Sequence, residues 1–393
     1  MLTATLPHSS QSSALAKPNS HQAALERCVE RVKSTSRIFG LRNPQIGSVE
    51  DGWQYCNPFD WVISFYPGQL WLAYQFNGEP GLANLARARQ ADLNLLLSNL
   101  AAQDHDLGFI FSLNCVADWK LTGSQTARQM ALRAAEALRA RFRPAGGYIQ
   151  AWNSHGTENT TRSTFVAGRI IADTMQNLAL LYWAHAETGA PDFKTIADAH
   201  AEATRRNLIR EDGTSFHTFV FDTTTGAPLR GETHQGYAHD SCWARGQAWL
   251  VHGFAQSYRA TGNSEYLDAA RLVAAKAEEL MGADRVPLWD LRLPADEPQY
   301  LDSSAGAILS AGLFILADVT SGEEKIRWHA FADRLLDGLI ETCDVTQIEG
   351  AQGLLDYGAA HVRRGSVRNM LPYGDYYFME ALMRSLGHSR FCW

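Results

Sequence analysis

Two aspartates stand in stretches that are otherwise apolar. Asp173 lies within GRIIADTMQNLALLYW (168–183), and Asp106 lies within DHDLGFIFSLN (104–114). A half-buried carboxylate needs either a partner or a proton. On one continuous helix, Arg169 would lie one turn before Asp173 and could form a simple ion pair with it. Alternatively, Asp173 faces the mouth of a cavity, where apolar neighbours raise its pKa and make it a general acid.

Asp106 also has two interpretations. Because His105 and Asp106 open an apolar segment, Asp106 could simply cap a helix and interact with its dipole. The same placement would keep Asp106 ionised. Two carboxylates whose surroundings drive their pKa values apart are what acid/base catalysis needs, so Asp106 is the predicted partner of Asp173.

The segment HQGYAHDSCWARGQAW carries the densest group of polar and aromatic side chains. Arg245 stands between Trp243 and Trp249 within two turns of a predicted helix. An arginine between tryptophans suits a planar carboxylate held against a ring. The alternative is a core helix with a stacked arginine. The loop in front of this helix carries His234 and Gln235.

Further candidates are Trp61 in FDWVISFYPG, Trp152 in YIQAWN, and His217 in a predicted short strand. A tryptophan fills a core more often than it forms a platform for a sugar, and both alternatives stay open here. The sequence holds no phosphate-binding glycine loop, no HExxH and no GxSxG. Both carboxylate candidates are aspartates and the histidines are scattered, so neither a metal nor a cofactor is expected.

Helical periodicity recurs along the chain in pairs, each an apolar helix followed by a short polar turn and an alanine-rich amphipathic helix. Neither helix of a pair can bury its apolar face alone, so neighbouring pairs must stack. The pattern predicts about twelve helices, near residues 20–36, 66–78, 80–102, 106–122, 124–142, 165–188, 191–208, 242–261, 263–281, 302–320, 322–343 and 374–387.

Six stacked pairs predict an all-α fold, an (α/α)6 barrel closed into a toroid whose apolar first helices line a cavity. The last helix would pair with the first to close the ring. Segments such as GGYIQAW and SFHTFVFDTTTGAPL predict short strands in the connecting loops. We therefore expect a single catalytic domain over 19–393, preceded by a disordered tail over 1–18.

The composition limits the classes of partner. The chain has 393 residues and a net charge of −7 without long runs of one sign, so neither nucleic acid nor a membrane is expected to bind it. No apolar run approaches the length of a membrane span, and the first residues lack the features of a signal peptide. The six cysteines lie far apart, which indicates free thiols in a reducing compartment. We expect a cytoplasmic protein.

Several stretches together carry a family resemblance: WVISFYPGQLWLAY, HDLGF, RIIADTMQNLALLYWA, HQGYAHDSCWARGQAW, LDSSAGAILSAGL and YGDYYFMEALMR. In order and over most of the chain, they resemble the motifs of the unsaturated glucuronyl hydrolases, glycoside hydrolase family 88. The resemblance implies an (α/α)6 barrel. It also implies an enzyme that removes a 4,5-unsaturated uronic acid from the non-reducing end of lyase-generated oligosaccharides.

The resemblance also assigns roles. The family's acid/base aspartate matches Asp173, which would protonate C4 and activate water for attack at C5, after which the hemiketal opens and releases the next sugar. The second aspartate matches Asp106 and would tune the site. Positions that hold the uronate match His217, Gln235 and Arg245, and aromatic walls match Trp61 and Trp152. The remaining predicted substrate contacts are His105, His234, Trp243 and Trp249.

Alternatives stay open. An unsaturated rhamnogalacturonyl hydrolase has the same fold, a sugar 2-epimerase would need a pair of histidines, and a helical-repeat scaffold would be open and elongated. The chain could act as a monomer or a homodimer. SHGTENTTRS (154–163) and YGAAHVRRGSVRNMLPYGD (357–375) depart from the family pattern, which leaves the next sugar open. Arg363 and Arg364 could meet an anionic sugar or lie in a solvated loop.

Overall fold

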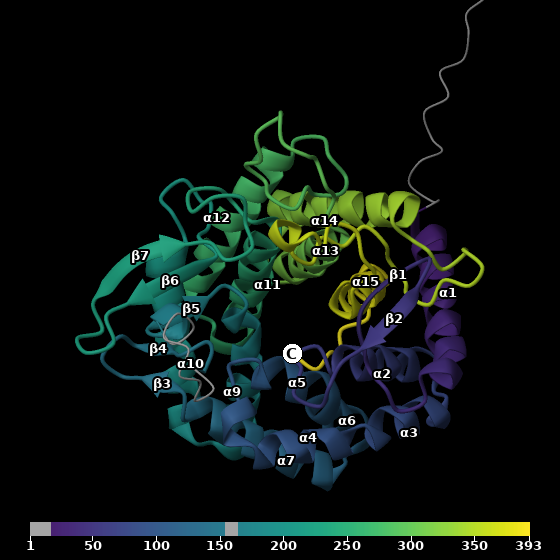
Figure 1. Cartoon of the computed structure of the whole chain (residues 1–393), viewed down its shortest axis with the longest axis horizontal. Helices are drawn as coiled ribbons and strands as arrows, with labels where there is room; N and C mark the ends of the chain where they lie inside the picture. The colour runs from purple at the N-terminus through teal and green to yellow at the C-terminus, as the bar shows by residue number, and fades with distance from the viewer. Residues whose placement is uncertain (1–16, 154–163) are drawn as a thin grey trace, which may run out of the picture.

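The helices form a closed ring of two layers (Figure 1). The computed structural model describes residues 17–153 and 164–393. Its helices are α1 (Lys17–Phe39), α2 (Phe65–Asn77), α3 (Pro80–Ala88), α4 (Gln90–Ser98), α5 (Leu107–Phe111), α6 (Ala117–Thr122), α7 (Gln125–Arg139), α9 (Thr174–Thr188), α10 (Pro191–Leu208), α11 (Ala244–Thr261), α12 (Ser264–Met281), α13 (Ser303–Asp318), α14 (Gly322–Thr342) and α15 (Pro372–Ser385). The predicted (α/α)6 barrel is confirmed.

The inner helices are apolar on all sides because protein surrounds them. α13 is buried from Ser303 to Ala317 and packs against α11, α14 and α15. A helix that is apolar all round belongs inside a large protein. The outer helices bury one face, as α7 does with Ala127, Ala131 and Ala134. Contacts of α15 with both α1 and α2 close the ring.

Glycines connect several inner helices to the outer helices that follow them. Gly123 after α6, Gly189 after α9 and Gly262 after α11 all have positive φ angles. A left-handed residue at this position ends a helix, and glycine adopts that conformation without strain. Each inner helix can therefore reverse sharply into an outer one.

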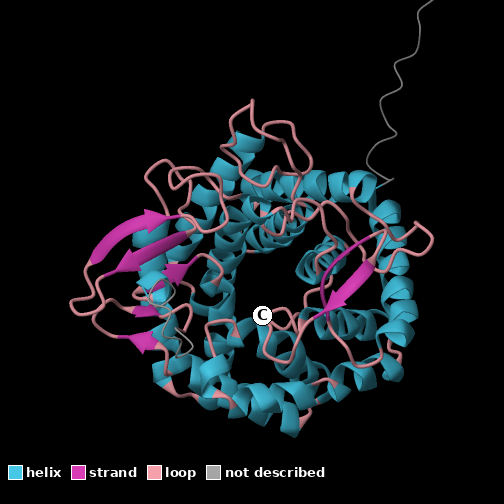
Figure 2. Cartoon of the chain, viewed as in Figure 1, coloured by secondary structure: helices cyan, strands magenta, loops and turns pink. Residues whose placement is uncertain are grey.

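The strands lie in the connecting loops (Figure 2). β1 (Pro44–Ser48) pairs with β2 (Gly52–Tyr55), and β3 (Phe142–Arg143) pairs with β4 (Tyr148–Ile149). A second group forms an antiparallel sheet in the order β5 (Arg169–Ile171), β6 (Thr218–Phe221) and β7 (Pro228–Glu232). In this sheet, Arg169 lies opposite Val220.

The predicted helix over 165–188 is wrong in its first part. Strand β5 occupies Arg169–Ile171, and α9 begins only at Thr174. The buried β-branched pair Ile170 and Ile171 suits a strand as well as a helix. Pairing with β6, about fifty residues later in the chain, decides between the two.

Two other predicted helices are interrupted. The range 80–102 breaks between α3 and α4 at Arg89, whose buried guanidinium donates to the carbonyl oxygens of Gly40 and Leu85. The range 106–122 contains a π-helical turn over Ser112–Val116.

Parts of two predictions fall outside the described residues. These are residues 1–16 of the predicted tail and the segment 154–163. The last two residues of the predicted tail, 17–18, belong to α1, which begins at Lys17. Over 17–153 and 164–393, none of the helices has the length and apolar character needed to span a membrane.

Candidate active site

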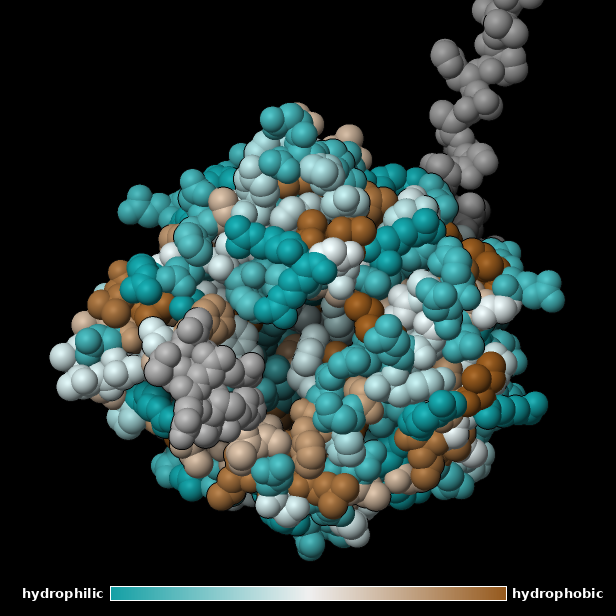
Figure 3. Space-filling model, in the orientation of Figure 1, coloured by the Kyte–Doolittle hydropathy of each residue, from teal (hydrophilic) through white to brown (hydrophobic). Residues whose placement is uncertain are grey.

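The site is a hollow where the first turns of the inner helices meet the connecting loops. Its volume is about 290 Å³. The face seen in Figure 3 is hollowed near its centre. The lining consists of Gln45, Ile46, Asp60, Trp61, Val62, Asp173, Gln235, Trp243, Arg245, Ala360, Leu371 and Tyr373. The fold thus brings together Trp61, Asp173, Gln235, Trp243 and Arg245 of the predicted residues.

Asp173 joins a strand to a helix in the lining of this hollow. It follows β5 and is the N-cap residue of α9, and the N–H of Ala172 donates to the carbonyl oxygen of His217 (3.1 Å). The Oδ1 atom of Asp173 is buried and has no hydrogen-bond partner among the described residues. Burial raises the pKa of Asp173 to about 7, although Arg245 acts in the opposite direction. Asp173 can therefore carry a transferable proton near neutral pH.

Of the two alternatives for Asp173, the ion pair with Arg169 is not formed. Because Arg169 lies in β5, its side chain points to the sheet, where Nη1 lies 2.7 Å from Oε2 of Glu232 and donates to Oγ1 of Thr218 (2.7 Å). Its Nε donates to the carbonyl oxygen of Phe165 (2.6 Å). Arg169 therefore stabilises the sheet whose strand β5 leads into Asp173. It does not neutralise the carboxylate of Asp173.

Asn177 links the two aspartates. Its Nδ2 lies 3.3 Å from Oδ1 of Asp106 and 3.3 Å from the carbonyl oxygen of Asp173, and its Oδ1 accepts the N–H of Phe109 (2.6 Å). The surroundings of Asp106 act against the predicted ionised form. Burial raises the pKa of Asp106 well above its usual range, and Asp104 and Asp173 raise it further. Asp106 also makes no side-chain cap bond at the start of α5.

Gly108 is the point where α5 comes closest to α9. A Cβ atom at Gly108 would lie 2.3 Å from Cα and 2.4 Å from the carbonyl oxygen of Asn177. We expect Gly108→Ala to lower the free energy of unfolding by about 1–3 kcal/mol and to separate Asn177 from Asp106.

Gly81→Ala is the matched control. A Cβ at Gly81 in α3 meets nothing within 4 Å, and alanine favours a helix by up to about 1 kcal/mol over glycine. Denaturant unfolding measures both changes. Equal stability of Gly108→Ala and wild type would contradict the close packing of α5 on α9.

His105 lies behind the hollow and supports it. Its Nδ1 lies 3.1 Å from Oγ1 of Thr174, and its Nε2 lies 3.5 Å from Oδ2 of Asp106. Burial lowers the pKa of His105 well below its usual range, with Arg141 lowering it further. His105 is therefore neutral and positions Asp106. The predicted contact of His105 with substrate is not supported, because both of its ring nitrogens face protein groups and it is not among the lining residues.

Arg245 is the cation of the hollow. Its Nη1 donates to Asp302, to Oγ of Ser304 (3.2 Å) and to the carbonyl oxygen of Ala359 (3.0 Å). Its Nη2 donates to the carbonyl oxygen of Ala360 (3.0 Å). These fixed bonds hold the guanidinium in one orientation while it remains part of the lining.

The arginine does not lie between the two tryptophans that the sequence suggests. Its guanidinium lies over the ring of Trp243 (4.6 Å to the centroid) and over the ring of Tyr373 (5.4 Å). Trp249 is fully buried and packs on Phe109 and Tyr377, both with centroids 5.3 Å away. The predicted contact of Trp249 with substrate is wrong, because its position on α11 turns it into the core.

His217 directly precedes β6 instead of lying within it. Its Nδ1 accepts the N–H groups of His234 and Gln235 (both 3.1 Å), so its Nε2 carries the proton. That Nε2 is buried and has no partner in the described part of the chain. Burial lowers the pKa of His217 well below its usual range. His217 packs on Trp243, with ring centroids 4.0 Å apart.

Of the two predicted aromatic walls, Trp61 is among the residues that line the hollow and Trp152 is not. Trp61 packs on Tyr373 (5.1 Å between centroids). Trp152 is partly exposed and packs on Phe165 (5.7 Å) and edge-on to His234 (6.1 Å). Gln235 donates from Nε2 to the carbonyl oxygen of Ala360 (2.9 Å).

Some lining residues were missed by sequence reasoning. For Tyr373, the only indication in the sequence is that its segment departs from the family pattern. Nothing in the sequence indicates a role for Gln45 or Asp60. Asp302 belongs to LDSSAG, a matching motif without an assigned role, and fixes Arg245. Arg363 and Arg364 are exposed, and both contribute to lowering the pKa of His234, after the larger effect of burial.

The described residues include no group of three or more His, Cys, Asp or Glu side chains that could hold a metal ion. A closed α/α barrel whose hollow combines an aspartate of raised pKa, tryptophan rings and a fixed cation has the groups that acid/base catalysis on an anionic sugar needs.

Comparisons with known proteins identify the family, although no model of a known protein family matches the chain. The chain is 37% identical over 355 residues to an unsaturated glucuronyl hydrolase of Bacillus sp. (strain GL1), covering 88% of this chain and 91% of the relative. It belongs to the unsaturated glucuronyl hydrolase family. It is also 32% identical over 367 residues to an unsaturated chondroitin disaccharide hydrolase of Streptococcus pneumoniae, covering 92% and 90% of the two chains.

Solved structures agree with this assignment. The crystal structure of the unsaturated glucuronyl hydrolase from Bacillus sp. GL1 superposes with a TM-score of 0.86 at 35% identity, covering 93% of this chain and 96% of that one. The structure from Streptococcus agalactiae gives a TM-score of 0.87 at 29% identity, covering 97% and 95%.

Proposed function

We propose that this glycoside hydrolase removes a 4,5-unsaturated uronic acid from the non-reducing end of an oligosaccharide by hydrating the C4=C5 double bond. The observation that carries the proposal is Asp173, which combines a pKa of about 7 with an unpartnered Oδ1 in a hollow beside Arg245. An enol ether is hydrated by protonation of carbon followed by addition of water, and one carboxyl group can serve both steps.

The uronate carboxylate binds beside Arg245, which lines the hollow, and His217, which packs on the lining residue Trp243. His217 offers its Nε2–H, because its Nδ1 already accepts two backbone N–H groups. Arg245 contributes mainly its positive charge, since fixed partners occupy both of its Nη atoms. Trp61 and Trp243 provide apolar surfaces for the sugar ring.

The protonated Asp173 gives its proton to C4 of the sugar. Positive charge develops at C5, next to the ring oxygen. The Asp173 carboxylate then takes a proton from a water molecule as the water oxygen bonds to C5, which restores the protonated side chain. The hemiketal at C5 opens, and the anomeric carbon releases the next sugar together with the glycosidic oxygen. Asp106, held by Asn177, orients the Asp173 turn.

The pH dependence follows from the raised pKa of Asp173. The proton donor is present below about pH 7 and is lost above it, so kcat/KM should fall as the pH rises through about 7. The folded state also binds this proton more tightly than the unfolded chain does. That stabilisation of the fold is complete at pH values below the ordinary pKa of an aspartate. It is lost as the pH rises through about 7. Initial rates between about pH 5 and about pH 9 measure the first effect. A rate that increases through this range would contradict a proton-donor role.

A panel of unsaturated disaccharides tests the substrate class. Relatives include a chondroitin disaccharide hydrolase and an unsaturated glucuronyl hydrolase specific for heparin. Lyase products of chondroitin, hyaluronan, heparin, xanthan and rhamnogalacturonan would be compared through the ultraviolet absorbance of their conjugated C4=C5 carboxylate. Loss of absorbance with glucuronate-type substrates supports the proposal. Loss with rhamnogalacturonan products alone would assign the related rhamnogalacturonyl hydrolase activity, and no loss with any of them would contradict both.

We also propose that residues 19–393 form one catalytic domain, that the enzyme needs no cofactor, and that it is cytoplasmic, as a monomer or a homodimer. The six free cysteines suit a reducing compartment. Light scattering distinguishes the two assembly states.

A further inference from the structure

Two hollows lie at the end of the barrel opposite to the active site. Their volumes are about 350 Å³ and about 370 Å³, and both are lined by Lys120, Arg259 and Trp393. Helix α11 carries Arg245 at the active site and Arg259 near its other end. At 1.5 Å per residue these two positions are roughly 21 Å apart along the helix axis.

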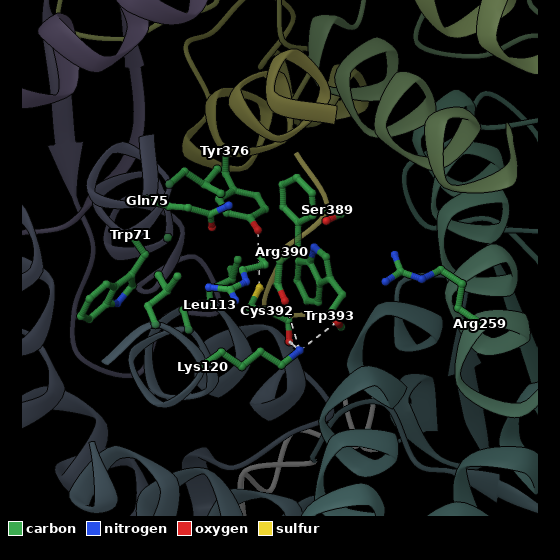
Figure 4. Close-up of a pocket in the computed structure, with 15 residues that line it drawn as sticks. Trp71, Gln75, Leu113, Lys120, Arg259, Tyr376, Ser389, Arg390, Cys392 and Trp393 are labelled. Atoms are coloured by element: carbon green, nitrogen blue, oxygen red, sulfur yellow. Dashed lines mark hydrogen bonds between the residues drawn. The ribbon is translucent and has the colours of Figure 1, made fainter. Parts of the chain in front are cut away.

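Residues 389–393 line the first of these hollows, and Trp393 lines both of them. Figure 1 places the end of the chain at the centre of the ring, and Figure 4 shows how Lys120 holds it. Lys120 Nζ donates to the carbonyl oxygens of Phe391 (3.1 Å), Cys392 (3.1 Å) and Trp393 (3.0 Å). Phe391 and Cys392 are buried, so this segment is part of the interior of the barrel.

Trp393 is fixed on several sides. Its ring is parallel to that of Tyr377, with an angle of 2° and centroids 6.0 Å apart, and it lies edge-on to His252 (5.9 Å). Its Nε1 donates to Oε2 of the buried Glu380 (2.7 Å). Burial alone would raise the pKa of Glu380, but Arg384, His252 and Trp393 lower it to about 2. The indole is therefore anchored to an ionised carboxylate in the barrel core.

Trp393 also lies directly below the active site. Phe109 contacts Trp393 on one side (6.2 Å between centroids) and Trp61, which lines the site, on the other (5.9 Å). Met175 lines the same hollow of about 370 Å³ as Trp393. Because Met175 follows Asp173 by two residues, this hollow reaches the first turn of α9 from the side opposite to the substrate.

We propose that residues 388–393 form a plug that closes the barrel and keeps water in the two lower hollows from passing the layer of Phe109 and Tyr377 to reach the Asp173 side chain, with Trp393 as its central positioning residue. The inference rests on the proposed function, because Asp173 reports the effect. The charged and titratable groups that face Asp173 are Arg245 of α11, Asp106 before α5, and Tyr373 and Tyr377 of α15.

Of these groups, only Tyr377 has a described ring contact with Trp393. Loss of the indole therefore has a larger effect on the hydration below Asp173 than on the charges that surround Asp173. Burial is the main cause of the raised pKa of Asp173, so entry of water should lower that pKa.

The test compares the pH–rate profiles of wild type, Trp393→Ala and Trp393→Phe. Trp393→Ala should shift the alkaline limb of kcat/KM to lower pH by about one unit, which is roughly a tenfold loss of rate above pH 7 and little loss below it. Trp393→Phe keeps a ring on Tyr377 and should restore the limb to near the wild-type position. Arg390→Ala is the control, because it alters an exposed side chain of the same plug.

Thermal unfolding of each variant separates this effect from simple loss of stability. An unshifted alkaline limb in Trp393→Ala, with or without a lower Tm, would overturn the proposal. An equal shift in Arg390→Ala would overturn it as well. If Asp173→Asn keeps its activity, the proposed function fails. If Asp173→Asn is inactive and the alkaline limb of Trp393→Ala is not shifted, only the plug is overturned.

Discussion

Asp173→Asn should fold like the wild type and lose its turnover by about 10²–10⁴-fold, the usual contribution of a positioned proton donor. Asparagine has nearly the same shape but cannot give a proton to C4. Its folding should not suffer, because Oδ1 of Asp173 accepts no hydrogen bond from the described residues. Above about pH 7 the variant should even be more stable than wild type, since it avoids burying a charge. Steady-state kinetics and thermal unfolding at two pH values measure both effects.

The controls for this variant come from the same chain. Asp240→Asn removes a carboxylate from the exposed loop before α11 and should leave kcat unchanged. Asp106→Asn should cost less than Asp173→Asn, because Asp106 does not transfer the proton in the proposed mechanism and asparagine can keep a bond to Asn177. Full activity of Asp173→Asn would remove Asp173 from the chemistry.

Arg245→Ala should weaken both substrate binding and the fold. The change leaves the fully buried Asp302 without its cation, and breaking a buried ion pair in this way costs about 3–5 kcal/mol of unfolding free energy. The loss of positive charge beside the uronate should raise KM. Because Arg245 lowers the pKa of Asp173, its removal should also move the alkaline limb of the pH profile upward, opposite to Trp393→Ala.

A second substitution separates the two effects of Arg245→Ala. The double variant Arg245→Ala/Asp302→Asn removes both charges and should recover much of the stability, while KM stays high. Arg245→Lys keeps a charge but cannot reproduce the several bonds of the guanidinium, so it should have an intermediate KM. Unchanged kinetic constants in Arg245→Ala would refute the binding role.

The sequence predicts the ring of helices because each helix has its own period of apolar residues and its own end signals. It does not predict β5, since Arg169–Ile171 is too short for its period to distinguish a strand from a helix. Its partner β6 lies about fifty residues away, and only the folded chain brings them together. The alternative of an ion pair between Arg169 and Asp173 depends on this single error.

In the site, too, short motifs predict which residues take part, but they do not predict burial that depends on residues far away in the chain. Motifs predict Asp173, Gln235 and Arg245 in one hollow, and the structure places them there. Spacing could not distinguish Trp243, which precedes α11 and faces the hollow, from Trp249, which the helix turns into the core. Nor could it predict that the pKa of Asp106 is raised, because its burial is caused by elements far away in the chain.

The most direct test of the central claim uses a carbon-linked analogue of the unsaturated disaccharide, in which the bond at the anomeric carbon cannot be hydrolysed. Hydration of C4=C5 does not need that bond to break. Wild type should therefore remove the ultraviolet absorbance of this analogue, and Asp173→Asn should not. If wild type cleaves the natural disaccharide but leaves the absorbance of the bound analogue unchanged, the reaction begins at the anomeric carbon and the hydration mechanism is wrong.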